Sequence, residues 1–179
     1  MRTKFTLVIL GCIIGVFSFS VRSHASNFQG KASFKYPDGK SVNIDTKIDT
    51  VHGWFSYELD EITGNIDIPF PLEETNVNND SQDTDYEKLK CSFHSKDFQY
   101  EENADVHLSR FVTQCRNNGG PIIEIEGAFS HLSITYCSGE NDISLRFYVH
   151  KLESNGTVGK QFLGYVYLTK YYSDTDKTF

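Results

Sequence analysis

Short segments in which apolar and polar residues alternate make up most of the chain. The clearest stripe is Ile143, Leu145, Phe147 and Val149, whose members are separated by polar, charged or amphipathic residues. A period of two residues is typical of a β-strand with one buried face. The same pattern predicts strands over residues 28–36, 41–48, 55–59, 66–70, 89–93, 122–127 and 132–136.

Residues 161–172 break this pattern, because apolar side chains occupy both parities. Phe162, Val166 and Leu168 fall on one parity, and Leu163, Tyr165 and Tyr167 fall on the other. Strands that are buried on both faces have near-continuous apolar sequences. The segment therefore predicts a strand that is covered on both sides.

Turn sequences divide these segments. Candidate turns lie at residues 37–40 (Pro-Asp-Gly-Lys), 60–64, 138–141 and 154–157 (Ser-Asn-Gly-Thr). Asn-Gly is a strong hairpin signal, because both residues tolerate a positive φ. Eight or nine antiparallel strands follow. Such a sheet must protect its edges, so the fold class is all-β, as an antiparallel barrel or alternatively a β-sandwich.

One segment predicts a helix. Ala104, Leu108, Phe111, Val112 and Cys115 fit one helical face within residues 103–118, and a glycine follows at position 119. Strand alternation is the rival interpretation, and we expect one short helical segment here.

The first 25 residues resemble a secretory signal peptide. Arg2 and Lys4 precede an apolar run over residues 5–19, and Ser23 and Ala25 place small residues before a cut after Ala25. The run is shorter than the roughly 20 residues that span a bilayer. We expect a periplasmic or secreted protein without stable membrane insertion, with residues 26–179 as one domain.

Charge narrows the possible partners. Without the leader, the chain has 14 basic against 24 acidic residues, a net charge of −10. This balance, without a basic cluster, argues against nucleic acid as a partner. Residues 73–87 hold six acids, three asparagines and no base, which predicts a solvated surface loop. Its spacing approaches that of a calcium loop, but Ser81 stands where such a loop needs glycine, so we expect no metal there.

Catalytic motifs are absent from the sequence. The histidines lack zinc-site spacing, and there is no nucleophile elbow or phosphate loop. Asp105 and His107 could form an acid–base pair, but such spacing is common by chance. We predict neither enzymatic activity nor a cofactor.

Three cysteines remain after the leader, namely Cys91, Cys115 and Cys137. An oxidising compartment favours one disulfide and one free thiol. Cys91 shares the parity of Leu89 and Phe93 and so fits a buried thiol. The other two pairings stay possible, but this parity favours a Cys115–Cys137 disulfide.

Several short motifs together resemble the YceI-like family. The order and spacing agree over residues 41–125, including Val51-His-Gly-Trp-Phe55, Thr63-Gly-Asn-Ile-Asp67, Asp105-Val-His107-Leu108, Phe111 and Pro121-Ile-Ile-Glu-Ile125. The resemblance implies a lipocalin-like barrel that holds an isoprenoid or another long apolar molecule in an elongated tunnel. The sequence departs from the family at residues 37–41 and in its long acidic loop.

These observations predict an exported carrier of a long apolar, isoprenoid- or lipid-like ligand. Inward side chains of several strands would line the ligand site: Phe55, Tyr57, Ile66, Ile68, Phe93, Ile123, Ile125, Leu145 and Phe147. The same residues would equally form a filled core, since an eight-stranded barrel is barely wide enough for one small ligand. The alternative function is a secreted β-sandwich adhesion or carbohydrate-binding module, with Trp54, Tyr165 and Tyr167 exposed at its surface.

Overall fold

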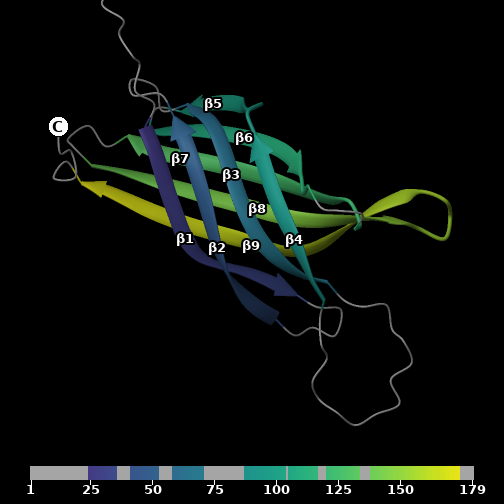
Figure 1. The fold of residues 1–179 in the computed structure, drawn as a ribbon. Helices are drawn as coiled ribbons and strands as arrows, with labels where there is room; N and C mark the ends of the chain where they lie inside the picture. Colours follow the sequence, from purple (N-terminus) through teal and green to yellow (C-terminus); the bar gives the residue numbers. More distant parts are fainter. Residues whose placement is uncertain are drawn as a thin grey trace, which may run out of the picture.

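A computed structural model describes residues 24–35, 41–52, 58–70, 87–103, 105–116, 120–133 and 138–173. This part of the chain contains nine strands and no helix (Figure 1). They are β1 (His24–Lys35), β2 (Ser41–His52), β3 (Leu59–Phe70), β4 (Glu87–Ser95), β5 (Gln99–Asn103), β6 (Val106–Gln114), β7 (Ile123–Ser133), β8 (Ser138–Leu152) and β9 (Val158–Ser173).

All nine strands belong to one antiparallel sheet in the order β4-β3-β2-β1-β9-β8-β7-β6-β5. The sheet curls into a half-barrel, so that its concave side forms the interior (Figure 1). The all-β, antiparallel prediction and the expected number of strands are confirmed. The described strands form a single sheet rather than the two facing sheets of a β-sandwich.

The interior is built from the alternation that the sequence displays. On β8, Ile143, Leu145, Phe147 and Val149 all face inward and are buried. Aromatic rings pack closely over glycines of neighbouring strands. A Cβ atom at Gly127 would lie only 2.0 Å from the ring of Phe111. The glycine therefore allows a ring to lie flat against the sheet.

The predicted helix over residues 103–118 is wrong, because most of this segment is β6. β6 pairs with β7 from Val106 opposite Leu132 to Gln114 opposite Glu124. Its Ser109 and Phe111 are buried, whereas the intervening Arg110 is exposed. The local sequence of this segment is compatible with both a helix and a strand. Pairing with β7 therefore decided that it forms a strand.

Two predicted turns are also wrong, since residues 60–64 lie inside β3 and residues 138–141 begin β8. Gly64 lies beneath the ring of Phe93. Asn141 is buried against His131. The turn at residues 154–157 is confirmed: Gly156 has a φ of 81°, and its amide donates to the carbonyl of Glu153 at 2.9 Å. The predicted turn at residues 37–40 and the acidic loop up to residue 86 lie outside the described residues.

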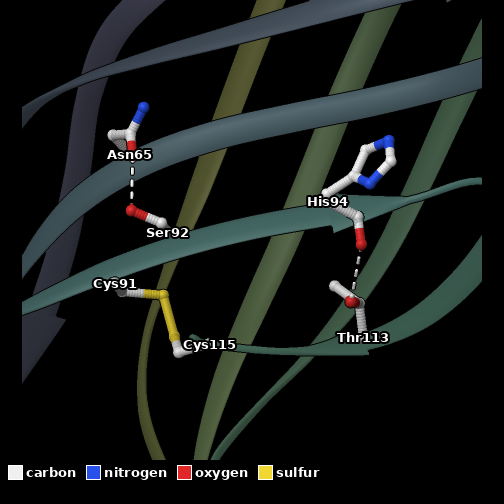
Figure 2. Close-up of a disulfide and its surroundings, with 6 residues drawn as sticks. All are labelled: Asn65, Cys91, Ser92, His94, Thr113 and Cys115. Carbon is white, nitrogen blue, oxygen red and sulfur yellow. Dashed lines mark hydrogen bonds between the residues drawn. A yellow bond between two sulfur atoms is a disulfide. The ribbon is translucent and has the colours of Figure 1, made fainter. Parts of the chain in front are cut away.

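A disulfide joins the two ends of the curled sheet. Cys91 on β4 is bonded to Cys115, which directly follows β6 (Figure 2). Beside it, the amide of Arg116 donates to the carbonyl of Ser92 at 2.8 Å, and the hydroxyl of Thr113 donates to the carbonyl of His94 at 3.1 Å. We call this junction of β4 and β6 the seam.

The seam corrects the predicted Cys115–Cys137 pairing. Cys91 is buried, as its parity indicated, but it is a disulfide partner rather than a free thiol. The reason is the curl of the sheet, which brings β4 at one edge against β6 near the other edge. Cys137 lies outside the described residues.

We expect disulfide mapping to find Cys91 linked to Cys115, with Cys137 as the free thiol once the predicted leader is removed. Alkylation under denaturing, non-reducing conditions followed by peptide mass spectrometry measures this. One labelled group per chain, on Cys137, is the expected result. Labelling of Cys91, or a linked peptide that contains Cys137, would contradict the assignment.

No helix among the described residues is long and apolar enough to cross a membrane. β1 begins at His24, so the predicted cut after Ala25 would remove only the first two residues of this strand.

Candidate functional site

Seven of the nine predicted ligand residues share the interior of the sheet. They are Ile66, Ile68, Phe93, Ile123, Ile125, Leu145 and Phe147, and each is at most 3% exposed. Phe55 and Tyr57 lie outside the described residues. Five of the seven have no accessible surface at all, so neighbouring atoms cover them on every side. In this conformation these side chains form a packed core.

A polar row crosses the inner face near one end of this core. The strand register places Glu102, His107, His131 and Asn141 next to one another on β5, β6, β7 and β8. The ring of His131 is hydrogen-bonded to the side chain of Asn141. Burial lowers the pKa of His131, and the hydrogen bond to Asn141 opposes this shift. His107 lies 3.7 Å from Glu102 rather than paired with Asp105.

The convex side of β7, β8 and β9 carries a second group of side chains, which we call the β7–β9 outer face. It comprises Ile122 directly before β7, Glu124 and Glu126 on β7, Arg146, Tyr148, His150 and Leu152 on β8, and Val158, Lys160, Phe162, Tyr165 and Tyr167 on β9. The register places Leu152 opposite Val158, His150 opposite Lys160, Tyr148 opposite Phe162, and Arg146 opposite Tyr165.

Ion pairs hold the centre of this face. Lys160 Nζ lies 2.5 Å from Glu124 and 2.6 Å from Glu126. His150 Nε2 lies 2.9 Å from the other oxygen of Glu124. The hydrogen bond from Lys160 holds the pKa of Glu124 below its usual value, although partial burial opposes this. The Glu124 side chain is only 14% exposed, so the surrounding side chains shield this carboxylate from water, whereas Lys160 is 40% exposed.

Apolar side chains surround the ion pairs. Lys160 lies 4.8 Å from the centre of the Tyr148 ring, which in turn packs edge-on against Phe162 at 5.7 Å. Six of the eight large apolar or aromatic side chains that stand exposed in the described part of the chain belong to the β7–β9 outer face. They are Ile122, Leu152, Val158, Phe162, Tyr165 and Tyr167, with exposed fractions from 43% to 76%.

The sequence predicted only part of this face. The exposure of Tyr165 and Tyr167 is confirmed, and Trp54 lies outside the described residues. The expectation that β9 is covered on both sides is wrong within this chain, because only its inner side is covered. The ion pairs were missed, because they join β7, β8 and β9 across a register that local sequence does not contain.

Residues that could hold a metal ion are not grouped anywhere in the described ranges: no three His, Cys, Asp or Glu side chains come close enough together. No protein-family model matches the chain, and neither a curated protein nor a solved structure matches it. The YceI-like resemblance therefore stays a prediction.

Proposed function

We propose that the protein is an exported binding module that docks a partner protein on the β7–β9 outer face. The observation that carries the proposal is the mismatch on β9. Its sequence is that of a strand buried on both faces, yet Phe162, Tyr165 and Tyr167 remain exposed on the convex side. A partner that covers these side chains would remove them from water, which is favourable.

The composition of the face supports a binding role. Tyrosine and arginine are enriched among residues that dominate binding energy, and here Arg146 lies opposite Tyr165. Arg146 forms no ion pair with any other described residue, so its charge is open to a carboxylate of the partner. Paired strands hold both side chains in place, which limits the entropy lost on binding.

A protein partner fits this face better than a glycan does. Leu152 and Val158 are 76% and 65% exposed and lie side by side at the end of the β8–β9 hairpin. Aromatic rings can stack on sugar rings, but aliphatic side chains such as these gain most from an apolar protein surface. Their burial would contribute roughly 25 cal/mol for each Å² of apolar surface removed from water.

Position-specific photocrosslinking tests this proposal. We expect a photoreactive phenylalanine analogue at position 167 or 152, in protein made in its native cell, to form an adduct with a second polypeptide. The same analogue at Gln99, exposed on β5, is the control and should form none. The adduct at position 152 should also disappear when Phe162→Ser is added.

Three results would count against the proposal. Equal labelling at positions 99 and 167 would show nonspecific contact. An adduct that contains only glycan would favour a carbohydrate-binding module. A mass equal to two copies of the chain would instead make the face a homodimer interface.

An apolar-ligand carrier is the second candidate function. The observation that favours it is the gradient along the interior, where the apolar side chains give way to the polar row of His107, His131 and Asn141. Such a gradient would suit a long apolar molecule with a polar end. Because the core side chains are packed, a ligand would have to displace some of them.

We expect solvent extracts of protein from a lipid-containing host to hold no apolar compound in stoichiometric amount. Mass spectrometry of the extract, with an extract of denatured and washed protein as the control, measures this. Recovery of one defined lipid per chain would favour the apolar-ligand carrier over the partner-binding module.

A further inference from the structure

We propose a second binding site, in which an extended segment of another protein adds as a strand between β2 and β3. The site, which we call the β2–β3 cleft, lies between residues 41–46 of β2 and residues 66–70 of β3. Strand β1 separates it from the β7–β9 outer face in the order of strands, and it shares no residue with that face.

The strand register leaves these two edges apart. β2 pairs with β1 over its whole length, from Ser41 opposite Lys35 to His52 opposite His24. Its pairing with β3, however, runs only from Lys47 opposite Asn65 to His52 opposite Leu59. Beyond Asn65, β3 continues to Phe70 but pairs only with β4. In Figure 1 the β1–β2 hairpin correspondingly diverges from β3 toward the lower end of the view.

A hollow in the structure occupies this divergence. It has a volume of about 390 Å³ and is lined by residues 42–45 of β2, by Asp67 and Pro69 of β3, and by Lys88 of β4. This volume lies in the range of ligand-binding clefts. A second hollow of about 510 Å³ shares Asp45, but it lies mainly over the paired strands β1 and β2 and reaches β3 at Asn65.

A buried hydroxyl without a partner marks the closed end of the cleft. Thr46 is 6% exposed, and its Oγ1 atom makes no hydrogen bond. It lies directly before Lys47, where the pairing of β2 with β3 begins. A buried polar group without a partner is costly, and such groups are rare in folded proteins. An added strand that ends here would bring backbone groups within reach of this hydroxyl.

The chemistry of the cleft selects an extended polypeptide as the occupant. Two facing strand edges present backbone N–H and C=O groups that another strand can pair with, as when peptides add to or insert into sheets. Pro69 has no N–H, so β2 offers the better edge. Val42 and Ile44 face inward. Apolar side chains at alternate positions of the added strand would pack against them. A second copy is disfavoured, because two copies of an acidic chain repel each other: the net charge is −7 for the full chain and −10 without the leader.

Hydrogen exchange with a defined probe tests the cleft. The probe is a synthetic peptide with the sequence of β1, residues 24–35, because Phe28, Ala32 and Phe34 give it apolar side chains at alternate positions. In the full-length protein alone, we expect part of the amides of residues 41–46 to exchange quickly, and those of residues 47–52 slowly. Saturating peptide should protect residues 41–46, while β1 and β9 stay unchanged. A scrambled peptide is the control.

The variant Thr46→Val separates binding from structure. It removes the buried hydroxyl at nearly constant shape, so the free protein should melt at the same or a higher temperature. Loss of one net hydrogen bond should weaken peptide binding roughly 2- to 10-fold. Three results of the exchange experiment would overturn the proposal. The amides of residues 41–46 could all be protected in the free protein, saturating peptide could add no protection there, or the peptide could protect β9 instead. Unchanged affinity of Thr46→Val would also overturn it.

Discussion

Replacing Phe147 by alanine is expected to lower the free energy of unfolding by about 3–5 kcal/mol. Phe147 has no exposed surface, lies opposite Ile125, and packs against Phe34 with ring centres 5.5 Å apart. Truncating a buried phenylalanine removes its transfer energy and leaves a cavity, and losses of this size are typical. Urea unfolding followed by tryptophan fluorescence or circular dichroism measures the change.

Tyr167→Ala is the matched control, because Tyr167 is an aromatic residue on the convex side of the neighbouring strand. It is 58% exposed, so its truncation should change stability by less than about 0.5 kcal/mol. A small loss at Phe147, together with an extractable lipid, would instead mean that this side chain borders a ligand tunnel. Equal losses at both positions would contradict the assignment of the inner and outer faces.

Removal of the disulfide is expected to cost about 3 kcal/mol of stability. Cys91 and Cys115 are 24 residues apart, and closing a loop of this length restricts the unfolded chain by roughly that amount. The double variant Cys91→Ala/Cys115→Ala should therefore unfold at a lower urea concentration. The seam should also open locally, so the amides of β4 and of the end of β6 should exchange faster.

Reduction of the wild-type protein separates the disulfide from the loss of packing at Cys91. Reduced wild type should lose nearly as much stability as the double variant, whereas Cys137→Ala should respond to reductant as the wild type does. If reductant left the wild-type unfolding curve unchanged, the seam would not depend on this bond.

The two-residue period was sufficient to predict the inner face of the sheet. Ile66, Ile68, Ile123, Ile125 and Leu145 all lie inward, because strand alternation depends only on local sequence. The same logic failed at residues 103–118. There the apolar residues fit a helix and a strand equally well, and the ladder between β6 and β7 decided the outcome.

The features that the sequence did not predict depend on contacts between strands, about which local sequence carries no information. The partner of Cys91 depends on the curl that brings β4 to β6. The contacts of Glu124 with His150 and Lys160 depend on the register of three strands. For β9, the sequence showed only that apolar residues occupy both parities. Which of its sides this chain covers could not be read from that pattern.

The central claim is that the convex side of β9 contacts a partner protein. The most direct measurement is the affinity of the purified crosslinking partner for wild type, Tyr167→Ser and the control Gln99→Ser by titration calorimetry. We predict that Tyr167→Ser weakens binding about 30-fold, the effect of losing a dominant contact of about 2 kcal/mol, with no change in melting temperature. Gln99→Ser should bind as the wild type does. Equal affinity of all three proteins would contradict the claim.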